Sequence, residues 1–124
     1  MRVADAHTVL LVDDHPGFRR LARQLLEAAG FRVSEAASGA EAATVAARLR
    51  PQLVLLDVQL PDIDGFQVAE RLAAERLDAV IVLTSTREAR DFGHRLAASP
   101  AAGFLPKDEL SGTRLRAFLE QAKV

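Results

Sequence analysis

The sequence predicts an α/β fold in which helices cover both faces of a parallel sheet. Segments with the pattern of a strand alternate with segments with the pattern of a helix, and the loops between them are short. The runs at 9–12, 53–56 and 80–83 are continuously apolar, as expected of strands buried on both faces. Alternation of this kind favours a single parallel sheet rather than separate layers of strands and helices.

Composition and charge narrow the class of protein. The chain has 124 residues, a formal net charge of -1 and no cysteine. This charge gives no general attraction to nucleic acid or to an anionic membrane, and the lack of cysteine excludes disulfides and thiolate zinc sites. No apolar run approaches the roughly 20 residues that span a bilayer, and the start lacks a signal peptide. We expect one cytoplasmic domain over residues 1–124, with no membrane partner and no direct nucleic-acid partner.

The first predicted strand runs straight into Asp13 and Asp14. Pro16 suits the first turn of the helix that follows, and Gly30 suits its end. Residues 31–34 then alternate between apolar and polar types, which indicates an edge strand with one covered face. The apolar positions of the first helix recur at helical spacing and are Phe18, Leu21, Ala22, Leu25, Leu26 and Ala29.

The second helix is predicted to begin near Ser38 and to end before Pro51. The strand at 53–57 follows and ends in the carboxylate of Asp57, and a loop rich in Pro, Asp and Gly covers 61–65. The apolar stripes of the second and third helices are Ala42, Val45, Ala46 and Leu49, and Val68, Ala69, Leu72 and Ala73.

The last third of the chain repeats the pattern less strongly. The third buried run is followed by Thr84, and residues 87–96 form the weakest predicted helix. Gly93 lies inside that helix, where glycine costs about 1 kcal/mol relative to alanine. A short strand at 102–105 leads to Lys107. A final helix has the apolar stripe Leu115, Phe118, Leu119 and Ala122.

Polar side chains follow the predicted strands at the same end. Asp13 and Asp14 follow the first strand, Asp57 ends the third, Thr84 follows the fourth and Lys107 the fifth. Parallel strands point the same way, so these groups share one rim of the sheet. If the first and third strands are neighbours, the carboxylates converge, and two of them about 4 Å apart repel by about 4 kcal/mol at an effective dielectric of 20. The excess negative charge requires a raised pKa or a hard divalent cation such as Mg²⁺.

This set of residues is suited to phosphoryl transfer onto Asp57, because a carboxylate can attack phosphorus and form an acyl phosphate. Each member also has a structural interpretation when taken alone. An aspartate at a strand end can form a turn or cap a helix, a lysine can be an ordinary surface residue, and a loop histidine is usually solvated. The residues with such a second interpretation are Asp13, Asp14, His15, Asp57, Asp62, Asp64, Thr84 and Lys107.

The whole chain closely resembles the receiver domain of bacterial two-component response regulators. The resemblance implies the flavodoxin-like doubly wound fold, with a five-stranded parallel sheet of order 2-1-3-4-5 and five helices. The motifs that carry it are Asp13-Asp14, Leu56-Asp57 through Pro61, Asp64-Gly65, Leu83-Thr84-Ser85 and Gly103-Phe104-Leu105-Pro106-Lys107.

The resemblance also implies roles for single residues. Asp57 is expected to accept the phosphoryl group, and Thr84 and Lys107 are expected to contact it. Phe104 matches the aromatic residue of the family's switch, although a core phenylalanine is the other interpretation. The expected ligands of Mg²⁺ are Asp13, Asp14, Asp57 and the backbone carbonyl of Gln59.

The implied function is a signalling switch and not an enzyme beyond its own phosphorylation and dephosphorylation. The implied phosphodonor is a sensor histidine kinase, a phosphotransfer protein or a small acyl phosphate. The fourth helix, fifth strand and fifth helix would form the output face, through which a homodimer could form. The alternatives are an Mg²⁺-dependent aspartyl-phosphate phosphatase, a flavin-binding module and a degenerate receiver that serves only for docking. Gln59 argues against the phosphatase, because such enzymes usually carry a second aspartate there.

Overall fold

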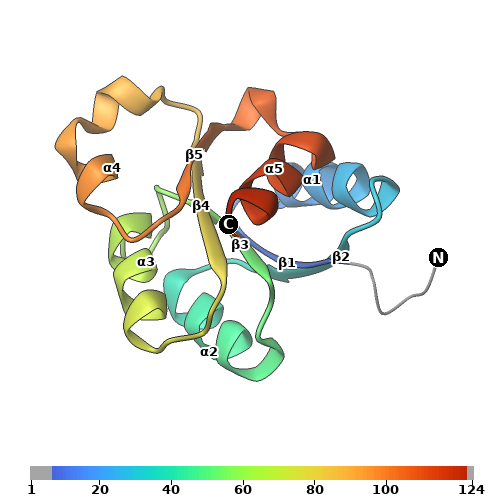
Figure 1. Cartoon of the computed structure of the whole chain (residues 1–124), viewed down its shortest axis with the longest axis horizontal. Helices are drawn as coiled ribbons and strands as arrows, with labels where there is room; N and C mark the ends of the chain where they lie inside the picture. The colour runs from blue at the N-terminus through green and yellow to red at the C-terminus, as the bar shows by residue number, and fades with distance from the viewer. Residues whose placement is uncertain (1–6, 123–124) are drawn as a thin grey trace.

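The computed structural model describes residues 7–122 as a five-stranded parallel sheet with helices on both faces (Figure 1). The strands are β1 (Thr8–Val12), β2 (Arg32–Ala36), β3 (Leu53–Asp57), β4 (Val80–Ser85) and β5 (Gly103–Pro106). The helices are α1 (Pro16–Ala28), α2 (Gly39–Leu49), α3 (Gly65–Ala74), α4 (His94–Ala98) and α5 (Gly112–Ala122). Two 3₁₀ helices, η2 (Ala89–Phe92) and η3 (Lys107–Glu109), lie on either side of β5 in sequence.

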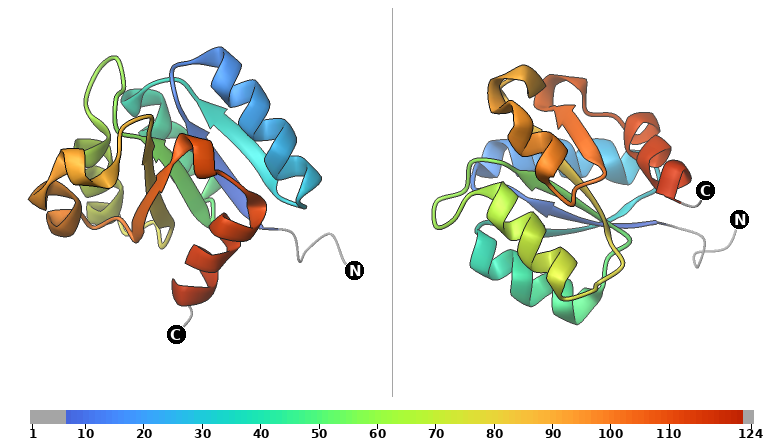
Figure 2. Two further views of the ribbon diagram at one scale, coloured as in Figure 1. Left: turned by 90° about the horizontal axis from the view of Figure 1, so that it is seen from above. Right: turned by 60° about the vertical axis from the view of Figure 1, so that its left-hand side comes forward.

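The strand order is β2-β1-β3-β4-β5, which confirms the predicted order. Helices α1 and α5 lie on one side of the sheet and α2 and α3 on the other (Figures 1 and 2). Each central strand alternates between the two layers. In β3, Leu53 and Leu55 pack with α1 and α5, whereas Val54 and Leu56 pack with α2 and α3. All four side chains are fully buried, so this strand is apolar on both faces as predicted.

Two aspartates of the loop before α3 hold helix ends in place. Asp64 is the N-cap of α3 and forms a capping box with Gln67. Asp62 accepts hydrogen bonds from the backbone N–H groups of Gly39 and Ala40, each at 2.9 Å, at the start of α2. These contacts confirm the structural interpretation of both carboxylates and tie the loop after β3 to the neighbouring helix.

The predicted apolar stripes of the helices include residues that the structure leaves exposed. Leu21 is 62% exposed, Leu25 36% and Leu49 49%, so the prediction that these residues face the core was wrong. In α1 the buried residues are Ala22 and Leu26, which face the sheet. Leu21 and Leu25 each precede one of them by one residue and therefore lie on the side of the helix. Leu49 is the last residue of α2, beyond the part of the helix that the sheet covers.

The predicted helix at 87–96 is interrupted. Gly93 has φ 57° and ψ −137°, a conformation that L-residues with a side chain rarely adopt, and it separates η2 from the five-residue α4. Neither short helix contains a buried residue. Two predicted strands also shift, since β2 extends to Ala36 and β5 starts one residue later than expected. No described helix is long and apolar enough to cross a membrane.

Candidate functional site

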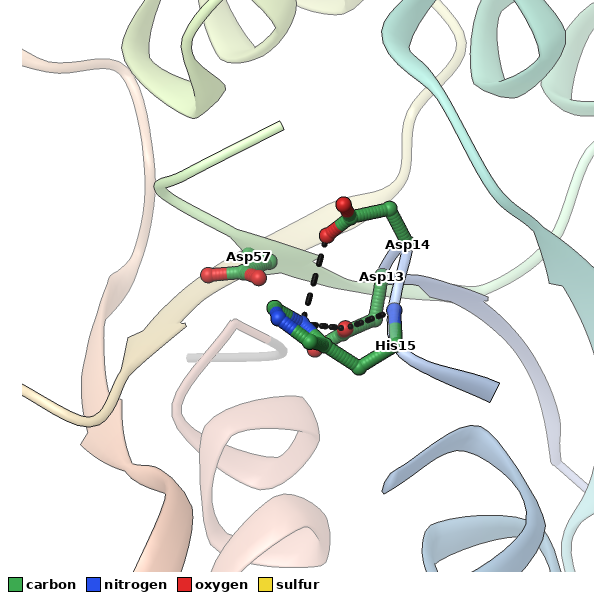
Figure 3. A group of neighbouring side chains, drawn as sticks. All are labelled: Asp13, Asp14, His15 and Asp57. Atoms are coloured by element: carbon green, nitrogen blue, oxygen red, sulfur yellow. Dashed lines mark hydrogen bonds and ion pairs between the residues drawn. The ribbon is translucent and has the colours of Figure 1, made fainter. Parts of the chain in front are cut away.

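The register of the central strands brings the predicted carboxylates together. Val12 pairs with Leu56, so Asp13, the next residue, lies beside Asp57. Asp13 is 0% exposed and Asp57 2%. One donor atom from each of Asp13, Asp14, His15 and Asp57 lies within 4.8 Å of the others (Figure 3). The predicted convergence of the acidic side chains is therefore what the structure contains.

Lys107 reaches the same cluster from the end of β5. Its Nζ lies 2.6 Å from Oδ2 of Asp13 and 3.3 Å from Oδ2 of Asp57. The ammonium also lies 4.5 Å from the centre of the Phe18 ring on α1, where a cation interacts favourably with the π face. Lys107 is thus held between a carboxylate pair and an aromatic ring, and it supplies one positive charge against three carboxylates.

The environment of Asp57 disfavours its charged form. Burial has the largest effect and, together with the negative charge of Asp13, raises the pKa of Asp57 to about 6. The hydrogen bond from the backbone N–H of Gln59 to Oδ1, at 3.1 Å, and the ammonium of Lys107 oppose this rise. The site thus contains an electrostatic strain that a cation could relieve.

This strain predicts a specific dependence of stability on pH. Because the pKa of Asp57 is higher in the folded chain than in the unfolded chain, its ionisation destabilises the fold as pH rises from about 4 to above 6. Without metal, Asp57→Asn should therefore be more stable than wild type near pH 8 by up to about 3 kcal/mol, and this advantage should vanish near pH 4. Urea unfolding followed by circular dichroism in EDTA measures the difference.

A second carboxylate provides the control for this measurement. Hydrogen bonds from the backbone N–H of Gln67 and from Arg95 outweigh the effect of burial and hold the pKa of Asp64 below its ordinary value. Asp64→Asn should accordingly lose stability at neutral pH, the opposite sign to Asp57→Asn. If the stability of Asp57→Asn followed the wild-type pH profile in EDTA, the raised pKa of Asp57 would be contradicted.

The two predicted switch residues make their described contacts on the β5 side of the site. Thr84 is buried and pairs with Asp57 across the strands, but its hydroxyl donates a hydrogen bond to the carbonyl of Leu105 at 2.6 Å. Phe104 is half-buried, and its ring centre lies 5.7 Å from that of Phe92 in η2. Thr84 is thus bonded to β5, and Phe104 of β5 lies against η2.

Two buried oxygens of the acidic cluster lack a hydrogen bond. Oδ2 of Asp13 and Oδ1 of Asp14 are in contact with Lys107 and His15 respectively, but neither contact has hydrogen-bond geometry. A buried carboxylate oxygen without a hydrogen bond is costly, and a divalent cation with oxygen ligands would lower that cost. The donor set thus fits an Mg²⁺ ion.

Comparison with known proteins identifies the family. The family model "Response regulator receiver domain" matches residues 9–120, which is nearly the whole chain. The chain is a response-regulator receiver domain. This confirms the resemblance inferred from the motifs.

Relatives of this receiver domain include longer regulators. It is 41% identical over 102 residues to a putative transcriptional regulator of Pseudomonas aeruginosa, covering 82% of this chain and 49% of that protein. It is 35% identical over 121 residues to the nitrate/nitrite response regulator protein homolog of Haemophilus influenzae, covering 96% of this chain and 56% of that protein. The chain spans about half the length of these curated relatives.

Solved receiver domains share the fold. The receiver domain of the putative response regulator NarL from Mycobacterium tuberculosis superposes with a TM-score of 0.83 at 32% identity, covering 95% of this chain and 97% of that one. A LuxR-family two-component response regulator from Aurantimonas sp. SI85-9A1 superposes with a TM-score of 0.85 at 26% identity, covering 94% and 87%.

Two further residues contact the acidic end of this receiver domain, and sequence reasoning missed the second. His15, for which a solvated loop position was favoured over a ligand role, directs Nδ1 at the acidic pair, although its side chain is 65% exposed. Arg19 donates through Nη1 to the backbone carbonyl of Asp13 at 2.6 Å and through Nε to Glu35 at 2.9 Å. The signal for Arg19 was its place one helical turn after His15 on α1, which returns it to the loop that carries Asp13.

Proposed function

We propose that this receiver domain is a phosphorylation-activated switch that accepts a phosphoryl group on Asp57. The observation that carries the proposal is the position of Asp57. It ends the central strand, is flanked by Asp13, the residue after β1, and lies 3.3 Å from the ammonium of Lys107. A buried carboxylate beside a fixed cation at the carboxyl end of a parallel sheet is well placed to attack phosphorus.

The proposed Mg²⁺ ligands are Asp13, Asp14, Asp57 and the backbone carbonyl of Gln59. When bound, the ion would neutralise charge on the transferring phosphoryl group. Asp13 has room for both interactions, because its Oδ2 faces Lys107 while its Oδ1 faces His15. The aspartates thus hold the charge that the cation needs, and Lys107 stays available for the phosphoryl oxygens.

The proposed chemical step is a transfer of phosphorus between two protein side chains. A carboxylate oxygen of Asp57 attacks the phosphorus of a phosphohistidine, the P–N bond breaks, and the electron pair leaves with the donor imidazole. The product is an acyl phosphate on Asp57, and Lys107 offsets the added negative charge. A small acyl phosphate would serve as donor in the same way, with a carboxylate as leaving group.

The proposed response begins at Thr84. To donate to a phosphoryl oxygen, its hydroxyl must give up the hydrogen bond to the carbonyl of Leu105. Phe104, the residue before Leu105, lies against Phe92, which lies 5.7 Å from the Phe66 ring on α3. Release of β5 would therefore be felt in η2 and α4, which contain no buried residue to resist a shift.

The proposed partners follow from this arrangement. A sensor histidine kinase or a phosphotransfer protein would approach the open end of the sheet, where the carboxylates lie. The face formed by α4, β5 and α5 would carry the signal onward, including to a second copy of the chain. A groove of about 360 Å³ on this face is lined by residues of β5 and α5, among them Phe104, Pro106 and Phe118. As a switch, the domain would catalyse only its own phosphorylation and dephosphorylation.

Metal removal tests the proposal directly. Incubation with acetyl phosphate and Mg²⁺ should add the mass of one phosphoryl group to the intact chain, and excess EDTA should reduce this labelling by at least about tenfold, because the carboxylates then repel the donor. Intact-mass spectrometry measures both. Equal labelling with and without EDTA would refute the metal-assisted site.

The same reaction separates the switch from a phosphatase. A switch holds at most one phosphoryl group and releases phosphate only as fast as its own acyl phosphate hydrolyses. A phosphatase with an aspartyl nucleophile would release phosphate from many substrate molecules at a steady rate. Continuous release from several phosphomonoesters, without accumulation of the labelled chain, would favour the second function.

A further inference from the structure

The backbone of Asp13 is fixed by contacts that lie outside the acidic cluster. Its N–H donates a hydrogen bond to the carbonyl of Ala36 at the end of β2, at 3.0 Å. Its carbonyl accepts a hydrogen bond from Nη1 of Arg19 on α1, at 2.6 Å. The second contact holds the peptide group that joins Asp13 to Asp14, and this peptide sets the directions in which the two carboxylates leave the chain. The geometry of the acidic pair therefore depends on where α1 places Arg19.

Arg19 is itself held in place by β2, which lies beside α1 (Figure 2). Its Nε donates to Oε1 of Glu35 at 2.9 Å, so two nitrogens of one planar guanidinium are bonded in different directions. Both side chains are largely covered, since Arg19 is 20% exposed and Glu35 28%. The hydrogen bond from Arg23 has the largest effect on Glu35 and, together with that from Arg19, outweighs burial and holds the pKa of Glu35 below its ordinary value. Glu35 is thus an ionised and fixed acceptor for Arg19 at neutral pH.

Arg23 shows what an ion pair between α1 and β2 requires by itself. It lies one helical turn after Arg19, on the same face of α1. Its Nη1 donates to Oε2 of Glu35 at 2.6 Å and its Nε to Oε2 of Glu27 at 3.1 Å. Within residues 7–122, its side-chain hydrogen bonds go to these two glutamates and none reaches the loop after β1. Arg23 already joins α1 to β2, so the contact of Arg19 with the carbonyl of Asp13 is not needed for that purpose.

We propose that Arg19, oriented by Glu35, is a positioning residue that fixes the peptide between Asp13 and Asp14 for cation binding. The inference rests on the proposed function, because it takes the two aspartates as ligands of Mg²⁺. This ion requires nearly ideal octahedral geometry with bonds of about 2.1 Å, so a rotation of one peptide disturbs two ligands together. Partners that only orient metal ligands typically contribute about 10- to 100-fold to metal affinity.

The charge of Arg19 gives the inference a sign that a purely electrostatic role would not share. A guanidinium near the carboxylates repels a divalent cation, so its neutralisation should by itself strengthen Mg²⁺ binding. Loss of the correct peptide geometry should weaken Mg²⁺ binding instead. A neutral variant of Arg19 that binds Mg²⁺ more weakly than wild type therefore reports on geometry and not on charge.

Calorimetric titration of Mg²⁺ alone into the metal-free chain tests the inference without any phosphoryl transfer. Arg19→Gln should weaken Mg²⁺ binding by about 10-fold or more. Arg23→Gln is the matched control, because it removes the same charge and the same partner, Glu35, but leaves the carbonyl of Asp13 bonded. Its affinity for Mg²⁺ should stay within about twofold of wild type, because salt screens the remaining effect of an exposed charge.

Urea unfolding followed by circular dichroism gives a second readout. Each protein is unfolded in EDTA and in Mg²⁺ well above its dissociation constant, and the difference removes the effect of the substitution on the metal-free fold. A tenfold loss of affinity reduces the stabilisation by Mg²⁺ by about 1.4 kcal/mol. The double variant Arg19→Gln/Glu35→Gln removes one charge of each sign and should show the same loss. It replaces Arg19→Gln if the single variant does not fold.

The outcomes separate this inference from the proposed function. Weaker Mg²⁺ binding in Arg19→Gln and in the double variant, with Arg23→Gln like wild type, supports the inference. If Arg19→Gln or the double variant binds Mg²⁺ no more weakly than Arg23→Gln while Asp14→Asn weakens binding, the acidic site stands and Arg19 does not position it. If Asp14→Asn leaves the affinity for Mg²⁺ unchanged, the proposed Mg²⁺ site is refuted and the inference with it.

Discussion

Asp57→Asn is expected to abolish phosphorylation of this receiver domain by acetyl phosphate and Mg²⁺. An amide oxygen carries no full negative charge and cannot form a stable acyl phosphate. Asp57 ends the central strand β3, and Asp13 and Asp14 beside it are the proposed ligands of the cation, so neither is expected to replace Asp57 as the phosphoacceptor. Labelling should fall to background, at least about 100-fold below wild type, which corresponds to about 2.7 kcal/mol in the barrier.

Asp62→Asn is the matched control for this prediction. Asp62 belongs to the loop that follows β3, but it is exposed and bonds the start of α2 rather than the cluster. It should be labelled at the wild-type rate. Intact-mass spectrometry of the three proteins over a time course makes the comparison, and undiminished labelling of Asp57→Asn would place the phosphoryl group elsewhere.

Gly65→Ala is expected to damage both the fold and the site. A Cβ at this position would overlap the backbone carbonyl of Asp57 and lie 2.8 Å from Cα of Val58. These are backbone atoms that cannot rotate away, and the N–H of Gly65 also donates to the carbonyl of Val58 at 2.7 Å. Relief of the overlap must move the end of β3 that carries the phosphoacceptor. We expect a loss of about 3 kcal/mol in unfolding free energy, the upper part of the range for overpacking.

The chain offers a contrasting glycine. A Cβ at Gly17 in α1 would meet no other atom within 4 Å, so Gly17→Ala should stabilise the helix by about 0.5–1 kcal/mol. Urea unfolding followed by circular dichroism measures both variants, and the labelling rate of Gly65→Ala should fall with its stability. If Gly65→Ala is as stable as wild type and is labelled at the same rate, the close packing of the loop against Asp57 does not matter for function.

The sheet and its acidic rim could be predicted because local patterns encode them. Continuous apolar runs such as 53–56 can be satisfied only by burial on both faces, and parallel strands must place Asp57 and the acidic pair at one edge. The helix starts at Pro16 and Ser38 were also predictable, since a proline in the first turn and a serine N-cap act on their own neighbours. The buried faces of the helices were less predictable, as the exposed Leu21 shows. How much of a helix is buried depends on the width of the sheet or helix that packs against it.

The amino-acid sequence alone thus determined which residues reach the rim of the sheet. Only the tertiary structure decided which atoms each of them contacts there. The hydrogen bond from Thr84 to the carbonyl of Leu105, the contact of Arg19 with the carbonyl of Asp13 and the approach of His15 to the acidic pair all depend on side-chain directions. The contacts of Thr84 and Arg19 each join two segments that are held by different helices or strands. Local sequence preferences do not specify the distance between such segments. The periodicity of apolar residues predicts which layer a residue packs in and where a strand ends. The direction of a side chain follows instead from three-dimensional packing and from the charges around the site.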